Sequence, residues 1–423
     1  MKVALLVHDL NVRGGTQRQL LELARYLTNT GHRPVIYAVD FAEECYPELT
    51  PGLEIRTNPD LGMERRQLLS ELAIRATKPL IAAKKVYLWR RWLHIRERIA
   101  QQFTRMIDLD TDLINGHDCA DLIYFARTRC NVPTVLQCND IPACFEVGLH
   151  LPTDRSAWTS VKRLFRLLGY GRKCRAYERR WMTAVDQVVV NVERNRRWLI
   201  ECYGRDARVF RCGVDLRGFT ATSRREGAAA AKPFRILSVG VFYRYRRFED
   251  LILAVEILQR KHDVVCDLVG YEASDQEYAE WLKELVARLG LKSRVQFHGQ
   301  VPEARLRELY ERSDVFVWCN HNQSWGNSVF EAMACGTPTV VSTSTGASEV
   351  LTDGVDALLV PPLSPPALAS RIEELIVSAE LRNRLASAGL AKVRQMSWSR
   401  YCEAMLSLFL EMLGGRKPIY SGR

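Results

Sequence analysis

Short apolar blocks alternate with longer amphipathic stretches along the first half of the chain. Five blocks rich in β-branched residues have the length of buried strands, at 3–7, 34–39, 113–116, 134–138 and 187–191. After the first block, Leu20, Leu23, Ala24 and Leu27 recur at positions i, i+3, i+4 and i+7, the period of a half-buried helix. This half of the chain therefore predicts strands and helices in alternation.

A second series of blocks repeats the pattern in the other half, at 235–240, 264–270, 294–299, 314–319 and 337–342. Strand–helix alternation predicts parallel sheets with helices on both faces. Two series predict an α/β protein with two Rossmann-like domains, whose ligands bind beyond the carboxyl ends of the strands. The polar tract TATSRREGAAAAK has neither pattern, so we place the linker within 205–232.

Composition narrows the class of protein. The chain has 423 residues, which at roughly 150 residues per domain predicts two or three domains. An apolar content of 47% and a charged content of 26% are typical of a soluble globular protein, and no apolar run approaches the roughly 20 residues that span a bilayer. The short apolar block at the N-terminus includes His8 and Asp9, so it predicts a first strand rather than a signal peptide.

The number and spacing of the cysteines indicate the redox compartment and whether a metal site is expected. The 12 cysteines are scattered, without a C-x-x-C pair or a histidine cluster at metal-ligand spacing. We therefore expect reduced thiols in a cytoplasmic protein, with no disulfide framework. No D-x-D motif follows a predicted strand, so we expect no metal site.

A glycine pair follows the first predicted strand, in HDLNVRGGTQRQLLELARYL. Gly14 and Gly15 let the backbone approach a ligand closely, and Thr16 with Gln19 fits the capping box that begins a helix. A helix N-terminus beside a glycine pair is a favourable anion site. The alternative is an ordinary turn between a strand and a helix.

The stretch SWGNSVFEAMACGTP combines a small polar turn, a short helix and a Gly-Thr-Pro stop. Asn327 or Ser328 can cap the helix, whose first N–H groups and dipole would then face a diphosphate. Glu331 follows within this helix and can accept two hydrogen bonds from the vicinal diol of a ribose. The alternative is that Glu331 only complements the helix dipole, an effect of about 0.3–1 kcal/mol.

These residues carry a family resemblance. Residues 323–341, QSWGNSVFEAMACGTPTVV, resemble the donor-site signature of the GT-B retaining glycosyltransferases of family 4, or group 1, whose usual form is E-G-F-G-(x)4-E-A-M-A-x-G-x-P-V-V. RGGTQRQ is similar to the G-G-x-Q-R loop of lipopolysaccharide-core glucosyltransferases. The segment 396–413 resembles the family's closing helix, which crosses back to the first domain.

The resemblance implies a GT-B fold, in which two Rossmann-like domains face each other across a cleft. It implies an acceptor-binding domain at 1–206, completed by a helix at 397–415, and a donor-binding domain at 207–396. It also implies a metal-independent retaining hexosyltransferase that uses a UDP-, GDP- or other nucleoside-diphosphate sugar and no further cofactor. The donor-binding residues that it implies are Gly14, Gly15, Arg18, Arg244, Gln323, Ser324, Trp325, Gly326, Asn327, Ser328 and Glu331.

Several family positions are substituted. Gln323 replaces the first signature glutamate; its amide keeps an acceptor, adds donors and loses the charge. The two phosphate-binding cations of the family correspond here to Val241 and Arg247. The same stretch also supplies Arg244, which would replace the missing cation, and Arg246; an arginine fork suits a diphosphate at least as well as lysine. A solvated basic face is the alternative.

Catalysis in such an enzyme is mostly electrostatic. The leaving diphosphate carries the developing charge, which Arg247 and backbone amides would stabilise, and the leaving phosphate can accept the proton of the acceptor. Asn139 occupies a position that is often histidine in the family; it cannot act as a base but can hydrogen-bond the donor sugar. His117 would orient or deprotonate an acceptor hydroxyl, and a structural role is the alternative for it and for His8.

Two other functions are kept open. Because three family positions are substituted, the chain could be a degenerate GT-B protein that binds a nucleotide sugar without transferring it. A GT-B nucleotide-sugar epimerase is the third reading, and both the signature and the phosphate arginines argue against it.

The basic charge predicts a partner. The formal net charge is +11, and residues 84–98 and 162–180 hold six and eight Lys or Arg, interleaved with aromatic and aliphatic residues. This composition is typical of a helix in an anionic membrane surface. We therefore expect a protein peripheral to the inner face of the membrane, with an acceptor that is lipid-linked or a cell-envelope glycan. No nucleic-acid-binding motif accompanies the charge, and a solvated basic face is the alternative.

Overall fold

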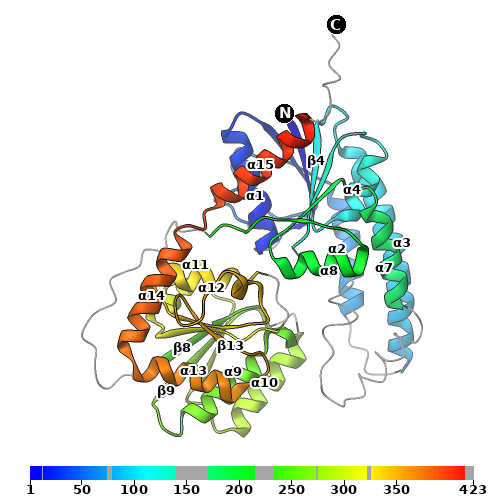
Figure 1. The fold of residues 1–423 in the computed structure, drawn as a ribbon. Coiled ribbons are helices and arrows are strands. Elements are labelled where there is room, and N and C mark those ends of the chain that lie inside the picture. The colour runs from blue at the N-terminus through cyan, green and yellow to red at the C-terminus, as the bar shows by residue number, and fades with distance from the viewer. Residues whose placement is uncertain are drawn as a thin grey trace. The chain divides into compact units, whose positions relative to one another are not determined.

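The chain folds into two compact units. The computed structural model describes residues 1–11, 13–73, 79–139, 170–214, 233–272, 275–321 and 325–414. Met1–Arg211 and Ser399–Arg423 form the first unit, and Cys212–Trp398 form the second (Figure 1). Each unit is built around one parallel sheet.

The first unit contains seven strands, and every neighbouring pair is parallel. The five blocks predicted in the first half of the chain are confirmed as β1, β2, β4, β5 and β6. The other two strands were not predicted, because β3 has only one large apolar side chain and β7 has two residues. In sheet order the strands are β3 (Glu54–Thr57), β2 (Arg33–Phe41), β1 (Lys2–Leu10), β4 (Leu113–His117), β5 (Thr134–Gln137), β6 (Gln187–Val190) and β7 (Arg208–Val209).

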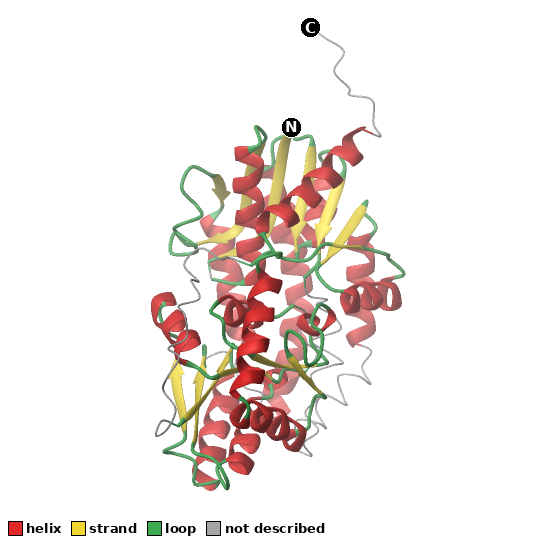
Figure 2. Ribbon diagram, turned by 60° about the vertical axis from the view of Figure 1, so that its left-hand side comes forward, coloured by secondary structure: helices red, strands yellow, loops and turns green. Residues whose placement is uncertain are grey.

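One face of this sheet is covered by two helices from opposite ends of the chain (Figures 1 and 2). In α1 (Gly15–Asn29), the four apolar positions predicted from their spacing are all fully buried. In α15 (Trp398–Gly414), Tyr401 donates a hydrogen bond from its hydroxyl to Gln137 Oε1 of β5 at 3.2 Å. The C-terminal helix therefore completes the first unit.

The other face of the sheet shares a core with the remaining helices. Leu6 of β1 and Tyr37 of β2 pack in one cluster with Phe103 and Ile123 from two of these helices. No helix in the described ranges is long and apolar enough to cross a bilayer. The helices are α2 (Pro59–Ala73), α3 (Pro79–Phe103), α4 (Ala120–Arg127), α7 (Tyr170–Met182) and α8 (Glu193–Tyr203).

The second unit contains six strands, again all parallel. The five predicted blocks are confirmed as β8 to β12, and the three-residue β13 was not predicted. In sheet order the strands are β10 (Val295–Gly299), β9 (Val264–Val269), β8 (Phe234–Val239), β11 (Val315–Trp318), β12 (Thr339–Ser342) and β13 (Leu358–Val360).

Helices pack on both faces of the second sheet (Figure 2). One face shares its core with α9 (Phe248–Leu258), α10 (Gln276–Arg288) and α13 (Pro365–Val377). On the other face lie α11 (Glu303–Arg312) and α12 (Asn327–Ala334), where Tyr310 packs against Phe316 of β11 with ring centroids 5.6 Å apart. The last helix of the unit is α14 (Ala379–Val393), which contacts α12 and α13.

Strand order decides where each unit can bind a ligand. The chain runs outward from β1 to β3 and then returns to the other side of β1 with β4; it repeats this from β8 to β10 and returns with β11. In open α/β sheets the crevice at such a topological switch point, at the carboxyl ends of the strands, is the usual ligand site. The relevant edges are those of β1 with β4 and of β8 with β11.

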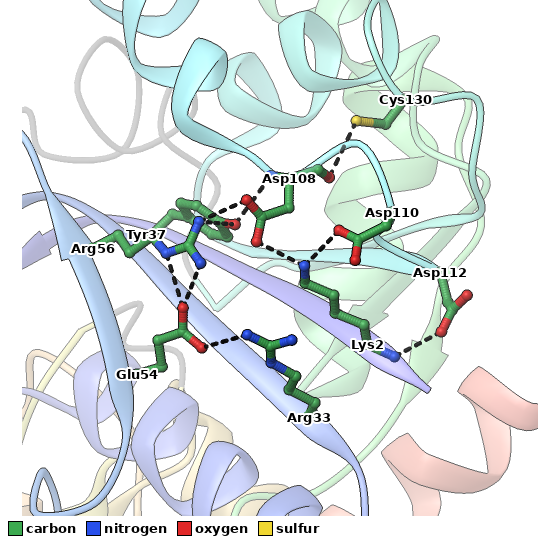
Figure 3. Close-up of polar contacts among 9 residues, drawn as sticks. All are labelled: Lys2, Arg33, Tyr37, Glu54, Arg56, Asp108, Asp110, Asp112 and Cys130. Carbon is green, nitrogen blue, oxygen red and sulfur yellow. Dashed lines mark hydrogen bonds and ion pairs between the residues drawn. The ribbon is translucent and has the colours of Figure 1, made fainter.

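A charged network lies at the amino end of β1 (Figure 3). Lys2 Nζ contacts Asp108 Oδ2 at 2.7 Å and Asp110 Oδ1 at 2.5 Å. Arg56 of β3 donates to Asp108 Oδ1 at 2.7 Å and pairs with Glu54. The network joins β1 and β3 to the segment before β4, at the edge opposite the switch point.

This network predicts an acid-dependent loss of stability. Hydrogen bonds from Arg56 and then from Lys2 lower the pKa of Asp108 to about 2 from its usual 3.8. A carboxylate with a depressed folded pKa stabilises the fold above its unfolded pKa, and this contribution is lost as pH falls through the folded value. In urea unfolding at pH 7 we expect Asp108→Asn to be about 1 kcal/mol less stable than wild type, allowing for solvent screening. The difference should largely vanish near pH 2; an undiminished difference there would assign it to packing.

Candidate functional site

The segment after β8 carries the predicted cations. Arg244 and Arg246 lie in a 3-10 turn, and Arg247 follows with a left-handed backbone (φ 55°) just before α9 begins. The Cys319 thiol is 3.5 Å from the carbonyl oxygen of Arg246 and 3.2 Å from that of Arg247. These contacts hold the strained turn against the end of β11.

Arg247 is neutralised by the first turn of its own helix. Its Nε and Nη2 donate to the two carboxylate oxygens of Asp250 at 3.0 and 2.7 Å, and its Nη1 lies 2.6 Å from Glu249 Oε1. A diphosphate would have to compete with two carboxylates for this guanidinium. The predicted catalytic role of Arg247 therefore stays a prediction.

Arg244 is directed toward the start of α10. Its guanidinium lies 3.7 Å from Asp275 and 3.9 Å from Glu277, and over the Tyr278 ring at 5.6 Å from the centroid. Its predicted role as the replacement for the missing family cation also stays a prediction.

Arg246 has different neighbours. Its guanidinium carbon lies 4.9 Å from the ring centroid of Trp318 and 5.2 Å from that of Tyr245. With the Asn320 amide oriented to satisfy its hydrogen bonds, the amide oxygen accepts from Arg246 Nη1 at 2.7 Å. Gly240 lies close to the same guanidinium, since a Cβ added to this glycine would be 3.4 Å from Arg246 Nε. In the described part of the chain no carboxylate pairs with this cation, which lies at the switch-point edge.

The helix after β11 begins differently from the prediction. Its N-cap is Gly326, at φ 96°, and a Cβ on this residue would lie 3.0 Å from Trp318 Nε1. Only glycine fits this combination of backbone conformation and close approach. The prediction that Asn327 or Ser328 caps α12 was wrong, because both already lie within the helix.

Buried polar atoms at this edge suggest the chemistry of a ligand. Arg246 Nε, Trp318 Nε1 and Asn327 Oδ1 have no hydrogen-bond partner among the described residues. Buried polar groups are normally paired, so this edge suits a polar ligand. A helix N-terminus and a guanidinium together favour an anion. Trp325 is buried and packs on Phe330 at 4.8 Å between ring centroids.

Glu331 lies in the second turn of α12 and is partly buried. The hydroxyl of Tyr310, a fully buried residue of α11, donates to Glu331 Oε2 at 3.0 Å. Tyr310 therefore orients the carboxylate, a role that no motif in the sequence indicated. Two predicted donor-binding residues, Gln323 and Ser324, lie outside the described residues.

The glycine pair of the first unit begins α1. Gly14 is the N-cap, with an extended backbone and no side-chain cap, and Gly15 is the first helical residue. The predicted capping box was therefore wrong. Thr16 instead donates to Asp118 Oδ2 at 2.8 Å, and Gln19 Oε1 accepts from Asn139 Nδ2 at 2.8 Å. Both side chains reach strand ends far away in the sequence.

Arg18, also predicted to bind the donor, lies on the first turn of α1. Its guanidinium is 3.7 Å from Glu22 and 5.8 Å from the ring centroid of Tyr46. The structure thus places Arg18 beside the glycine pair, where the sequence predicted an anion site.

Asn139 is engaged within the first unit. Its side chain is 6% exposed, and its Nδ2 donates to Gln19 and to Thr16 Oγ1 at 3.1 Å. Its Oδ1 accepts from Gln137 at 3.0 Å and from Asn191 at 3.3 Å. Both the nitrogen and the oxygen of the amide are thus engaged by described residues, so a contact with the donor sugar would have to displace these hydrogen bonds, and the predicted role of Asn139 stays a prediction.

The two histidine candidates have structural partners. His117 is buried, its Nε2 is 3.0 Å from Asn115 Oδ1, and burial lowers its pKa to about 3. A histidine with this pKa stays neutral and is a weak base, which favours the structural reading. His8 Nε2 is 3.0 Å from both carboxylate oxygens of Asp121, which also accepts from Arg96 Nε at 2.6 Å.

Known proteins resemble both halves of the chain. Residues 13–217 match the family model described as Glycosyltransferase Family 4. Residues 219–392 match the model described as Glycosyl transferases group 1. No group of three or more His, Cys, Asp or Glu among the described residues is arranged to hold a metal ion.

Individual relatives agree with these matches. D-inositol 3-phosphate glycosyltransferase of Thermomonospora curvata is 28% identical over 243 residues, 53% of this chain and little more than half (56%) of that protein. The protein of the same name from Salinispora tropica is 25% identical over 424 residues, 94% of this chain and 81% of that protein. HepE of Anabaena in complex with UDP-glucose is 18% identical, with a TM-score of 0.69 over 97% of this chain and 100% of that chain.

The structural likeness confirms the predicted fold class, two Rossmann-like units of the GT-B type. The two family models together match nearly the whole chain, so both halves of the chain are similar to the glycosyltransferases of group 1 and family 4.

Proposed function

We propose that the protein is a metal-independent retaining hexosyltransferase that transfers a sugar from a nucleoside diphosphate sugar. The observation that carries the proposal is the grouping of a cation and a helix N-terminus, with a carboxylate in the next turn, at the switch point of the second sheet. Arg246 and Gly326 both contact Trp318, and Glu331 follows in the helix that Gly326 caps. This grouping has the charges that a nucleoside diphosphate needs.

Each group would have a separate task. Arg246 and the first N–H groups of α12 would bind the diphosphate and stabilise the charge that develops as the sugar leaves. Glu331, oriented by Tyr310, would accept hydrogen bonds from the ribose diol. The cations are arginines, so the mechanism needs no metal. The neighbour HepE was solved with UDP-glucose, which makes UDP the first nucleotide to test.

The proposal of retention is supported by the lack of a suitable base among the candidate residues described. His117 has a pKa of about 3 because it is buried, and Asn139 has no basic group. The leaving phosphate would then take the proton of the acceptor, on the face that the donor sugar already occupies. The chemistry is thus front-face displacement, with the protein contributing position and charge.

A protein that binds a nucleotide sugar without transfer is the second candidate. The observation in its favour is the pairing of Arg247, which occupies the position of the family's phosphate cation, with Asp250 and Glu249. Release of free sugar from the donor, even slowly and without an acceptor, would exclude this candidate.

The donor assignment is tested by nucleotide binding. In a thermal-shift screen of UDP, GDP, ADP and their sugars, the true donor should raise the Tm of wild type by mass action. Glu331→Ala should bind that nucleotide about 30- to 150-fold more weakly, since a charged bidentate hydrogen bond is worth about 2–3 kcal/mol. Glu374→Ala, on α13 of the same unit, is the matched control and should bind as wild type does. Wild-type affinity in Glu331→Ala would refute the donor site.

The two arginines predict different defects. Arg246→Ala should lower kcat about 10²–10³-fold, the typical loss of one transition-state donor, with little change in stability. Arg247→Ala should mainly lower the free energy of unfolding, because it leaves Glu249 and Asp250 without their cation. Kinetics and urea unfolding of both variants separate the two effects. The reverse result, with the kinetic loss in Arg247→Ala, would return the catalytic role to Arg247.

We propose further that the acceptor is presented at an anionic membrane surface, as a lipid-linked molecule or a cell-envelope glycan. The formal charge of +11 supports this. The described parts of the two basic segments support membrane binding less strongly than their composition suggested. Trp92 is buried and Ile95 packs against the core, while Arg98 pairs with Glu64 and Arg180 with Glu97.

Liposome flotation tests the membrane proposal. Anionic vesicles should retain wild type at low salt and release it at high salt, because the Debye length falls from about 10 Å at 0.1 M to 3 Å at 1 M. The double variant Lys84→Glu with Lys85→Glu should lose most of this retention, at about 1 kcal/mol per basic residue. Lys261→Glu with Lys292→Glu, two exposed lysines of the second unit, is the control. Equal recovery with neutral vesicles, or none, would favour a water-soluble acceptor such as the inositol 3-phosphate for which the relatives are named.

A further inference from the structure

Each side-chain nitrogen of Arg247, in the second unit, contacts a carboxylate. Nε and Nη2 donate to the two oxygens of Asp250, and Nη1 contacts Glu249 Oε1. Asp250 alone thus supplies the bidentate partner that neutralises a guanidinium. Glu249 is a second carboxylate on a cation that is already paired, so the three groups together carry one excess negative charge.

Glu249 is fixed from two sides. It is buried in the first turn of α9, and its Oε2 accepts a hydrogen bond from the hydroxyl of Tyr278, a fully buried residue of α10. The same hydroxyl accepts from the backbone N–H of Phe248 at 3.0 Å. Tyr278 therefore holds the carboxylate against Arg247.

The charge of Glu249 depends on its pairing with Arg247. Burial disfavours the charged form of a carboxyl group, and it raises the pKa of Glu249 above the usual 4.5, a rise that the Arg247 guanidinium offsets only in part. Glu249 is therefore protonated at a higher pH than an ordinary glutamate, and Arg247 then keeps Asp250 as its partner in this cluster.

This cluster adjoins the cation that we assign to the diphosphate. Arg247 follows Arg246 directly in the chain, and the Cys319 thiol contacts the carbonyl oxygens of both residues. An anion that binds beside Arg246 is repelled by an excess negative charge on the neighbouring residues. It can also bond to Arg247 only where it displaces a carboxylate. Both effects weaken anion binding while Glu249 is charged.

We propose that Glu249 is a latch on Arg247: while charged, it keeps this arginine paired within the second unit and lowers the affinity of the unit for a diphosphate. The inference rests on the proposed function for the identity of that ligand. Protonation of Glu249 leaves Nη1 of Arg247 available to a phosphate oxygen. The latch thus regulates donor binding, and Glu249 takes no part in the transfer itself.

The latch predicts a pH dependence of donor binding. Among the described residues, the charged and titratable groups that face Glu249 are Arg247, Asp250, Tyr278 and Cys319. Burial raises the pKa of Tyr278 and of Cys319, so both stay neutral as the solution is acidified. As pH falls through the raised pKa of Glu249, Arg247 is released and the affinity for a diphosphate should rise. A nucleotide sugar keeps the charge of its diphosphate over this range, so the trend belongs to the protein.

The experiment removes the charge of Glu249 and keeps its shape. The Kd for UDP-glucose, or for the nucleotide sugar that the thermal-shift screen selects, is measured in wild type and Glu249→Gln from about pH 5 to about pH 8. Glu256→Gln is the matched control, since Glu256 lies on the same helix and pairs with Arg260 at 2.6 Å. Arg247→Ala, alone and with Glu249→Gln, completes a double-mutant cycle. Labelling of Arg247 by phenylglyoxal, read by peptide mass spectrometry, reports on the latch without any ligand.

Glu249→Gln should bind the nucleotide sugar roughly tenfold more tightly than wild type at neutral pH, the scale of one charged hydrogen bond. The rise in affinity that wild type shows on acidification should be largely absent in this variant, and phenylglyoxal should label Arg247 faster. The gain in affinity should disappear in the Arg247→Ala background, because the latch acts through Arg247. Glu256→Gln should bind the ligand as wild type does.

Unchanged or weaker binding by Glu249→Gln would overturn the inference. An equal gain in Glu256→Gln, or a gain that persists in the Arg247→Ala background, would overturn it as well, since general electrostatics would then be the cause. A wild type that binds no nucleotide sugar would refute the proposed function instead. The labelling needs neither a ligand nor a second substitution, so it would still decide whether Glu249 holds Arg247, and unchanged labelling in Glu249→Gln would rule the latch out.

Discussion

The parallel direction of all strands in each sheet is the constraint on which the rest of the structure depends. Parallel strands place every carboxyl end at one edge, and the order of strands opens a crevice where the chain reverses its course. In the first unit this edge collects the glycine pair, Asp118 and Asn139; in the second it collects Arg246 and the start of α12. Residues far apart in the sequence become neighbours there because the sheet aligns their strands.

The two edges of the first sheet differ in how their polar residues are held. At the amino edge, Lys2 and Arg56 pair with Asp108 in ion pairs that need no unusual backbone. At the carboxyl edge, Asp118 and Tyr46 keep left-handed conformations, and polar side chains meet over long sequence separations. Strain of this kind costs of order 1–3 kcal/mol per residue. The two described non-glycine residues of the first unit that have a positive φ thus both follow the carboxyl end of a strand.

Most of the fold could be predicted from the sequence, because buried parallel strands read as β-branched blocks and α1 shows a clear helical period. The polar site was harder to predict. The spacing of Thr16 and Gln19 fits a capping box, yet their partners are Asp118 and Asn139, more than a hundred residues away. Local spacing carries no information about such partners. The cap at Gly326 was missed for a related reason, since only the approach of Trp318 shows why glycine is required there.

Charge counted along a sequence overstates the charge available to a ligand. Arg244, Arg246 and Arg247 are equivalent by composition, but Arg247 carries two carboxylates and Arg244 lies near two more. The strength of an electrostatic contact depends on what already surrounds the charge, so a paired guanidinium must break existing bonds before it holds a phosphate. The aromatic rings of Tyr245 and Trp318 hold Arg246 in its orientation, and they do so without pairing it with a carboxylate. An aromatic support thus allows one cation of the stretch to be both fixed in place and available to an anion.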